Sequence, residues 1–276
     1  MWTDSNRRRS WRGPAAVLLT SIALVVAGGC AGPRTLCVMT YNIHHGEGTD
    51  GRLDLERIAA VINRHQPDIL ALQEVDRCTR RAGGVDQAAE LGRLTGMHAA
   101  FGAAMPYQGG EYGEAILARW APSETKTHAL RHSTGREPRA ALVARWSATE
   151  TPDADAPPFA FAIIATHLDH LPDATDRLMQ VADIASLATD LDGPVLLMGD
   201  LNAEPDTAEI GRLRATWRDC AAGEPQKTYP SREPNIRIDY VFARPAEHWR
   251  VVRTEAIEEL VASDHRPLLV VLETVE

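Results

Sequence analysis

Short apolar runs alternate with longer amphipathic runs along most of this 276-residue chain. The short runs are rich in Val, Ile, Leu and Ala and have the length of buried strands. In the longer runs apolar residues recur at steps of three and four, as at Leu55, Ile58, Ala59 and Ile62, which is the period of a helix with one buried face. The pattern predicts strands over residues 36–41, 68–72, 115–118, 140–146, 159–165, 195–198, 236–242, 249–254 and 267–272, and helices over residues 53–65, 85–94, 173–191 and 206–213.

The order of these elements restricts the fold. Helices and strands interleave, but several strands follow one another directly, whereas a doubly wound parallel sheet needs a crossover between successive strands. The order therefore predicts an α/β protein with two mixed sheets covered by helices. The acidic, Pro-rich segment 149–158 lies between two predicted strands and is typical of a hairpin loop rather than a domain linker.

The first thirty residues differ from the rest of the chain. Arg7, Arg8, Arg9 and Arg12 precede an uncharged stretch whose apolar centre covers residues 15–27. This centre is too short for a membrane span, which needs roughly 20 residues. A basic start, a short apolar region and then small residues are typical of an export signal. We expect residues 1–29 to be a signal peptide, residues 30–35 a short tether and residues 36–276 the folded domain.

Cys30 directly follows Ala27-Gly28-Gly29, and this segment resembles the lipobox of bacterial lipoproteins, in which the cysteine is lipidated and becomes the new N-terminus. The alternative is ordinary cleavage that leaves Cys30 as a plain thiol. The arginine run also has a faint similarity to a twin-arginine signal. The sequence thus predicts an exported protein of the cell envelope, anchored to the lipid bilayer through Cys30 or, without lipidation, secreted or periplasmic.

Composition and charge exclude several classes of protein. The chain is 44% hydrophobic and 24% charged, which is enough apolar sequence for a core and excludes disorder, coiled coil and a multi-span membrane protein. Loss of the leader removes four arginines and one aspartate, and so lowers the net charge from −9 to −12. Such acidity argues against a sequence-independent nucleic-acid binder. The three remaining cysteines, Cys37, Cys78 and Cys220, have no CxxC spacing and allow at most one disulfide, which excludes a disulfide scaffold or a zinc finger.

Polar side chains follow several predicted strands at the points where the strands end. They are the carboxylates Glu74, Asp200, Asp239 and Asp264, the amides Asn42 and Asn202, and the imidazoles His167 and His265. Any one of them alone is typical of a turn or a solvated strand end. Together, carboxylates at the ends of sheets repel one another unless a cation lies among them. Oxygen ligands favour Mg²⁺, with Mn²⁺ as a possible substitute, over Zn²⁺.

Six short segments contain these residues, and they occur in the order found in the endonuclease/exonuclease/phosphatase superfamily. This superfamily, the deoxyribonuclease-I-like metal-dependent phosphoesterases, is what the chain resembles from about residue 36 to residue 272. The segments are Met39-Thr40-Tyr41-Asn42, Leu72-Gln73-Glu74-Val75, Thr166-His167-Leu168, Gly199-Asp200-Leu201-Asn202, Arg237-Ile238-Asp239-Tyr240 and Ser263-Asp264-His265-Arg266-Pro267. The resemblance implies a four-layer α/β sandwich, with two mixed β-sheets packed face to face and helices on the outside.

The resemblance also implies roles for the matching residues. Glu74 corresponds to the principal metal carboxylate, and Asn42 and Asp264 complete or support the metal site. Asp200 and Asn202 correspond to the pair that positions the attacking water and the phosphate. Whether the site takes one metal ion or two stays open.

Two histidines are implied to face the phosphate. His265 corresponds to the histidine beside the scissile phosphate, and Asp239 orients it; a carboxylate there raises the pKa of the imidazole and helps it carry charge near pH 7. The alternative for this pair is a structural ion pair. His167 corresponds to a second phosphate-facing histidine. In nuclease members the positions of Tyr112 and Glu114 respectively touch the phosphate and orient the histidine that matches His167.

The remaining features are less specific. An arginine of the segment Arg136-Glu137-Pro138-Arg139 should face the phosphate, and of Arg136 and Arg139 we prefer Arg139. The segments His44-His45-Gly46 and Arg80-Arg81 either line the site or belong to solvated loops. Residues 108–111 are expected to form one wall of the cleft. The expected bystanders are Cys78, which this chemistry does not need, and Trp120, Trp146, Trp217 and Trp249, which we expect to pack rather than to stack on bases.

These observations predict a monomeric Mg²⁺-dependent hydrolase that cleaves phosphoester bonds, preferentially phosphodiesters, by metal- and histidine-assisted attack of water. Its substrate is either nucleic acid, as for an extracytoplasmic nuclease, or a lipid or sugar phosphate. The acidity disfavours the nuclease, and a lipid anchor would hold the enzyme beside lipid substrates. A non-catalytic binding module on the same scaffold would have lost a metal carboxylate or a histidine, and here every such position is filled.

Overall fold

Two six-stranded sheets form the framework of the computed structural model, which describes residues 1, 34–147, 157, 159–223 and 226–275. The first sheet has the order β11-β12-β1-β2-β4-β3 and the second the order β5-β6-β7-β8-β10-β9. The strands are β1 (Thr35–Asn42), β2 (Ile69–Arg77), β3 (His98–Tyr107), β4 (Gly110–Ala118), β5 (Glu124–Leu130), β6 (Arg139–Trp146), β7 (Phe161–His167), β8 (Val195–Asp200), β9 (Arg218–Asp219), β10 (Asp239–Arg244), β11 (Trp249–Ala256) and β12 (Leu268–Thr274). Both sheets are mixed, because β1 pairs in parallel with β2 and β7 with β8, while the other neighbours are antiparallel.

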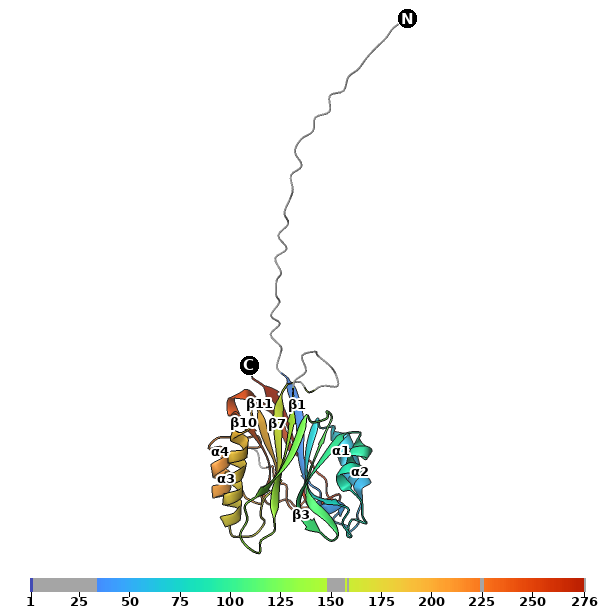
Figure 1. Cartoon of the computed structure of the whole chain (residues 1–276), viewed down its shortest axis with the longest axis vertical. Helices are drawn as coiled ribbons and strands as arrows, with labels where there is room; N and C mark the ends of the chain where they lie inside the picture. Colours follow the sequence, from blue (N-terminus) through green and yellow to red (C-terminus); the bar gives the residue numbers. More distant parts are fainter. Residues whose placement is uncertain (2–33, 148–156, 158, 224–225, 276) are drawn as a thin grey trace. The chain divides into compact units, whose positions relative to one another are not determined.

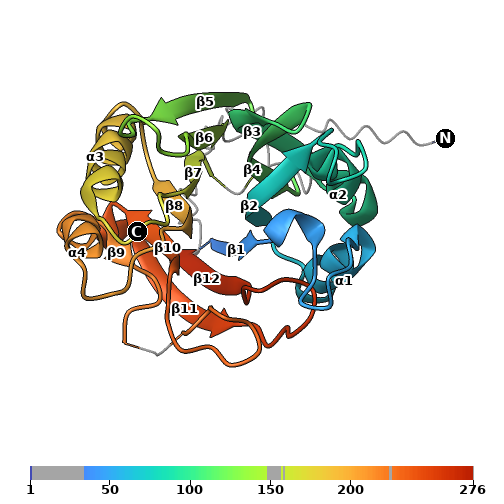
Figure 2. The same cartoon turned by 90° about the horizontal axis from the view of Figure 1, so that it is seen from below.

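Helices cover the outer face of each sheet. Figure 1 shows α3 (Thr175–Thr189) and α4 (Ala208–Arg214) on one side of the strands and α1 (Leu55–His65) and α2 (Gln87–Thr95) on the other. Seen along the strands, the two sheets lie face to face between these helix pairs (Figure 2). The four-layer α/β sandwich predicted from the sequence is therefore confirmed.

Alternation along the strands distributes the apolar side chains over three cores. Successive residues of a strand point to opposite faces, so Val38 packs between the sheets while Met39 packs against α1 and α2. A third core joins α3 and α4 to the second sheet. Because the central strands are buried on both faces, they appear in the sequence as continuous apolar runs. Trp120, Trp146, Trp217 and Trp249 are all buried in these cores, as expected.

Side-chain caps fix where the first two helices begin. Asp54 Oδ1 accepts a hydrogen bond from the Arg57 N–H at 2.9 Å, and Asp86 Oδ1 accepts one from the Ala89 N–H at 3.0 Å. An aspartate at this position satisfies a backbone donor that the first turn leaves free. Both helices therefore begin two residues later than the apolar pattern alone predicts, at Leu55 and Gln87.

The other differences from the prediction concern strands. Strands β3 and β5 were missed because β3 is rich in Ala and β5 is a polar, exposed edge strand, so neither carries a continuous apolar run. Strand β4 begins at Gly110, which places Tyr112 and Glu114 inside a strand. The prediction of a strand from residue 236 is wrong, since β10 begins at Asp239.

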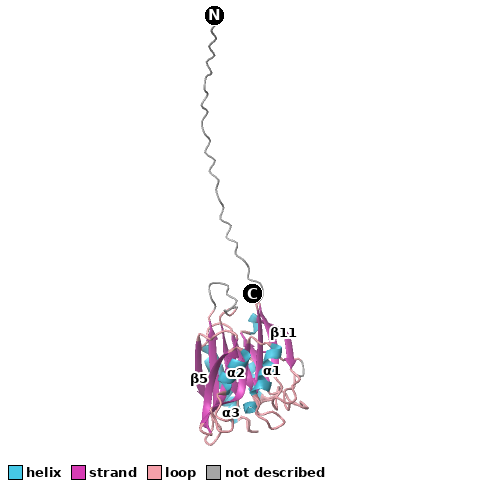
Figure 3. Ribbon diagram, turned by 90° about the vertical axis from the view of Figure 1, so that its right-hand side faces the viewer, coloured by secondary structure: helices cyan, strands magenta, loops and turns pink. Residues whose placement is uncertain are grey.

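Many of the connecting loops lie at one end of the sheets, the lower end in Figure 3. Within the described ranges, no helix is both long enough and apolar enough to cross a bilayer. The predicted signal peptide, Cys30 and nearly all of the predicted hairpin loop 149–158 lie outside the described residues. The two strands that flank this loop, β6 and β7, pair antiparallel as a hairpin requires.

Candidate active site

A cleft of about 640 Å³ opens where the predicted site residues meet. The predicted residues that line it are Glu74, Tyr112, Arg139, His167, Asp200, Asn202, Asp264 and His265. The other three, Asn42, Glu114 and Asp239, are at most 1% exposed and lie behind this lining. The structure thus brings together residues that are up to 223 positions apart in the sequence, from Asn42 to His265.

Strand ends explain this convergence. Asn42, His167 and Asp200 are the last residues of β1, β7 and β8. Asp239 begins the antiparallel strand β10 and pairs directly with Asp200 in the register of the sheet. Glu74 lies within β2 at a bulge opposite β4, with a φ of 57°. A bulge of this kind re-aims a side chain out of the regular alternation of the strand, and here it directs Glu74 into the cleft.

Asn42 holds two of the carboxylates. Its Nδ2 donates to Glu74 Oε1 at 3.0 Å and to Asp200 Oδ2 at 3.2 Å. Its backbone carbonyl accepts a hydrogen bond from Ser263 Oγ at 2.7 Å, which fixes the segment carrying Asp264 against the end of β1. The amide therefore organises the carboxylates from both sheets.

His265 is paired with Asp239 and faces Asp200. Its Nδ1 lies 3.0 Å from Asp239 Oδ2, and its Nε2 lies 3.6 Å from Asp200 Oδ2. Burial alone lowers the pKa of His265, but the charge of Asp239 and its hydrogen bond raise this pKa to about 10. The imidazole is therefore positively charged at neutral pH, as the sequence predicts for a histidine beside a phosphate.

The remaining carboxylates are suited to a hard cation. Burial and, after it, the nearby charge of Asp239 raise the pKa of Asp200 to about 7. Burial also tends to raise the pKa of Glu74, but neighbouring groups, among them His167 and the Asn42 amide, lower it well below its usual range, so Glu74 is ionised. Carboxylate and amide oxygens are the donors that Mg²⁺ and Mn²⁺ prefer. The residues present thus fit the divalent ion that the sequence predicts.

His167 is a neutral hydrogen-bond acceptor in this site. Asn202 Nδ2 lies 2.9 Å from His167 Nε2 and also donates to the Leu168 carbonyl, so Nε2 carries the lone pair. Burial, with the charge of Arg139, holds the pKa of His167 well below its usual range. Among the described hydrogen bonds, none joins Glu114 to His167, and Glu114 Oε2 and His167 Nδ1 are both buried without a partner. The orienting role of Glu114 stays a prediction.

The two arginines of the segment 136–139 differ in whether they line the cleft. Arg139 begins β6, is 2% exposed and lines the cleft, where its Nη2 lies 3.1 Å from His170 Nδ1. Arg136 does not line the cleft, and its Nη2 lies 3.8 Å from Asp173 Oδ2. Of the two, Arg139 is the one placed to meet a phosphate.

Several cleft residues were not predicted. The Tyr229 ring lies 4.8 Å from the His265 ring, in a loop whose sequence carries no signal for such a role. His170 follows His167 by three residues, and this spacing was its only signal. For Arg81 the sequence allows either a place in the site or a place in a solvated loop, and the structure shows that it lines the cleft. Arg81 donates two hydrogen bonds, of 2.6 and 2.9 Å, to the buried Asp76. Its guanidinium lies 4.6 Å from the centre of the Tyr107 ring. Tyr107 and Tyr112 line the cleft, whereas residues 108–111, which the sequence predicts as a wall, do not.

Comparison with known proteins agrees with this geometry. The sequence model of the Endonuclease/Exonuclease/phosphatase family matches residues 39–265. The chain belongs to this family. Comparison with curated proteins gives no match. As a member of the family, the chain is a metal-dependent phosphoric ester hydrolase, and the groups of residues able to hold a metal ion are consistent with this.

Solved structures of the endonuclease/exonuclease/phosphatase family share the fold. A family member from Beutenbergia cavernae has 25% identity and a TM-score of 0.67, over 87% of this chain and 72% of its own. A mannosyl-6-phosphatase from Bacteroides thetaiotaomicron has 19% identity and a TM-score of 0.69, over 87% of this chain and 100% of its own. The catalytic domain of human Nocturnin has 19% identity and a TM-score of 0.68, over 88% of this chain and 97% of its own.

Glu114 leads to a prediction for the pH dependence of stability. Burial raises its pKa from 4.5 to about 8, although the charge of Arg139 acts in the opposite direction. The folded protein therefore keeps a proton that the unfolded chain releases. This contribution to the free energy of unfolding is complete below pH 4.5 and falls by up to about 1.4 kcal/mol per pH unit as the pH rises to about 8.

The variant Glu114→Gln stays neutral and is expected to remove this slope. Thermal unfolding of the variant and the wild type between about pH 5 and pH 9 measures the difference. The variant should gain stability relative to the wild type as the pH rises. A constant difference over the whole range would show that Glu114 is ionised in the folded protein.

Proposed function

We propose that this chain is an Mg²⁺-dependent phosphodiesterase that activates water with Asp200 and stabilises the transition state with His265. The observation that carries the proposal is the contact series from Asp239 to His265 to Asp200, with separations of 3.0 and 3.6 Å, beside the oxygen donors Glu74 and Asp264. An imidazolium and a buried carboxylate thus lie in one cleft with oxygen donors that could hold a metal ion.

Each side chain of the cleft has its own role in the proposed hydrolysis. Asp200 accepts the proton of the attacking water, and its Oδ1 is fixed by the Asn202 N–H at 2.9 Å. Asn202 Nδ2 bonds to His167 Nε2 and to the Leu168 carbonyl, and these two contacts fix the orientation of the Asn202 amide, which lines the cleft. His265, charged and held by Asp239, stabilises the negative charge that develops on the phosphoryl oxygens. When bound, Mg²⁺ held by Glu74 and Asp264, with Asn42 in support, would supply further positive charge to these oxygens.

The charge of the cleft supports a diester rather than a monoester. In the described part of the chain, each arginine that lines the cleft already lies beside a carboxylate: Arg81 beside Asp76 at 2.6 Å, Arg139 beside Glu137 at 3.3 Å and Arg177 beside Glu209 at 2.7 Å. Little unbalanced positive charge therefore remains for a second negative charge on the substrate. A diester carries one negative charge at neutral pH, and a monoester carries nearly two.

Metal removal and a matched pair of substrates test this proposal. Mg²⁺-loaded protein is expected to hydrolyse bis-p-nitrophenyl phosphate with a kcat/KM at least about tenfold above that for p-nitrophenyl phosphate, equivalent to about 1.4 kcal/mol of transition-state stabilisation. Chelation by EDTA should abolish turnover, and Mg²⁺ should restore it. Turnover that survives EDTA contradicts the metal requirement, and a preference for the monoester contradicts the argument from charge.

We propose a small phosphodiester, such as a lipid or sugar derivative, over long nucleic acid. The net charge of −12 without the leader opposes the approach of a polyanion. A panel of DNA, RNA, sphingomyelin, phosphatidylinositol and sugar phosphates decides between the classes. Faster cleavage of DNA or RNA than of any other member would make the protein a nuclease.

For the location of the protein, we propose export and anchoring through a lipidated Cys30. The basic start, the short apolar centre and the small residues before Cys30 support this. Mass spectrometry of the mature N-terminus is expected to find Cys30 as the first residue with the added mass of a lipid. An unmodified Cys30 at the N-terminus leaves a secreted or periplasmic enzyme, and a different first residue contradicts the predicted cleavage site.

A further inference from the structure

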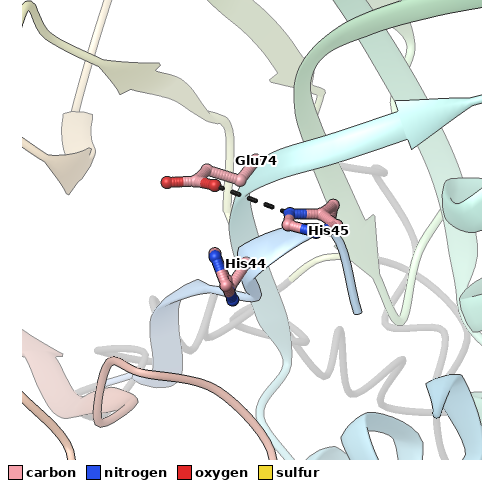
Figure 4. Close-up of side chains that lie close together, drawn as sticks. All are labelled: His44, His45 and Glu74. Atoms are coloured by element: carbon pink, nitrogen blue, oxygen red, sulfur yellow. Dashed lines mark ion pairs between the residues drawn. The ribbon is translucent and has the colours of Figure 1, made fainter. Parts of the chain in front are cut away.

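The loop after β1 places two imidazoles beside Glu74, whose other carboxylate oxygen, Oε1, accepts from Asn42. One ring nitrogen of His44, one of His45 and a carboxylate oxygen of Glu74 lie within 4.8 Å of one another. Figure 4 shows both histidine rings directed toward the Glu74 carboxylate, and the distance from His45 Nδ1 to Glu74 Oε2 is 4.0 Å. That distance is too long for a hydrogen bond. His45 Nδ1 is buried and has no hydrogen-bond partner among the described residues.

One residue, Glu47, lies beside a ring nitrogen of each histidine. The Glu47 carbonyl accepts from His44 Nδ1 at 3.1 Å, and Glu47 Oε2 faces His45 Nε2 at 3.5 Å. If these two nitrogens carry the ring protons, His44 Nε2 and His45 Nδ1 have free lone pairs. An acceptor behind each imidazole, which fixes the tautomer and leaves the other nitrogen free, is the usual second layer around metal-binding histidines.

The backbone of this loop is held in an unusual conformation. His44 and His45 both have a φ of 45°, in the left-handed region that non-glycine residues seldom adopt. The His44 N–H donates to Asn42 Oδ1 at 3.0 Å, and the His45 carbonyl accepts from Gln87 Nε2 at 2.6 Å. Such conformations persist where the surroundings enforce them, and they cluster at functional sites. Here they turn two consecutive side chains toward the same carboxylate.

We propose that His44, His45 and Glu74 form a second metal site, which binds a transition-metal ion such as Zn²⁺, Mn²⁺ or Co²⁺ next to the Mg²⁺ site. Two imidazole nitrogens and one carboxylate oxygen favour these ions over Mg²⁺, which prefers oxygen ligands. Ligands about 2.0–2.2 Å from an ion lie at most about 4.4 Å apart, so His45 Nδ1 and Glu74 Oε2 are already within reach of one ion. Glu74 Oε1 accepts from Asn42 on the other side, so this carboxylate is placed between the two sites.

The competing explanation is a doubly protonated His45 that lies between the carboxylates of Glu47 and Glu74 and only positions Glu74. It requires no metal ion and gives His44 no role. The two explanations differ in whether the folded protein binds a transition metal through both histidines.

Co²⁺ titration of the metal-free full chain in a large excess of Mg²⁺ separates them. We expect a single Co²⁺ to bind, with the visible absorption bands of a nitrogen-ligated ion, and Zn²⁺ to displace it. The variants His44→Asn and His45→Asn should each weaken Co²⁺ binding at least about tenfold, and Glu47→Gln about tenfold. Asn is used because it tolerates a left-handed backbone better than most residues. His132→Asn, at an exposed loop position, is the matched control and should bind Co²⁺ as the wild type does.

Two results would overturn the proposal. The first is the absence of saturable Co²⁺ binding in excess Mg²⁺. The second is binding that both asparagine variants leave unchanged, since the ion would then occupy the Mg²⁺ site. If the variants do not fold, nuclear magnetic resonance of the wild type gives the answer: Zn²⁺ should shift the ring signals of two histidines, and unshifted signals also overturn the proposal. Because the readout is binding, failure here is distinct from failure of Mg²⁺-dependent turnover.

Discussion

Replacement of His265 by alanine is expected to lower kcat and kcat/KM for bis-p-nitrophenyl phosphate by a similar factor of about 10³. His265 is 5% exposed, lines the cleft and is charged through its hydrogen bond to Asp239. Its charge therefore acts on the oxygens of the transition state without the screening of bulk water. An interaction that forms mainly in the transition state affects kcat rather than KM, and steady-state kinetics at saturating Mg²⁺ measures the difference.

Two further variants make this result specific. Asp239→Asn keeps the shape of the site but removes the charge that raises the pKa of His265, so the alkaline limb of the pH–rate profile should move to lower pH. His98→Ala, at an exposed position on β3, should leave the kinetics unchanged. If His265→Ala retains wild-type turnover, the pair of Asp239 and His265 is a structural ion pair.

Gly199→Ala is expected to destabilise the protein by at least about 3 kcal/mol and to lower kcat at least about 10²-fold. Strand β8 passes so close to β7 at this point that a Cβ on Gly199 would lie 1.9 Å from the Thr166 carbonyl oxygen. The clash is with backbone, so one strand must move. The residues that follow Thr166 and Gly199 are His167 and Asp200, so any such movement displaces two side chains of the cleft.

A second glycine of the same chain is the control. Gly211 lies in α4 and is exposed, and a Cβ added to it would meet no described atom within 4 Å beyond the backbone of its own helix. Gly211→Ala should therefore stabilise the protein by about 0.5–1 kcal/mol through the higher helix propensity of alanine, with unchanged kinetics. Chemical denaturation and steady-state kinetics of both variants are compared. Gly199→Ala with wild-type stability would show that the two strands separate there without cost.

Most of the fold was predictable because its signals are local. The central strands are buried on both faces and are continuously apolar, and α1 carries an apolar stripe with a helical period. The sequence of each of these elements therefore predicts which of its side chains are buried. Edge strands lack this signal: β5 packs few side chains, and its pairing with β6 comes from backbone hydrogen bonds that any sequence can form. The start of β10 was misplaced for a similar reason, because Ile236 forms an isolated bridge with Tyr229 outside the ladder.

The sequence alone determined which residue types stand at the ends of the strands. Six ordered segments were enough to predict the reaction class and many of the residues that line the cleft. Distances between these residues depend on how the sheets pack. Only the tertiary structure decided that Arg139 rather than Arg136 reaches the cleft, that His167 is neutral, and that Tyr229 lies against His265. The physical reason is that protonation and contact depend on burial and on neighbours distant in sequence, which local patterns do not encode.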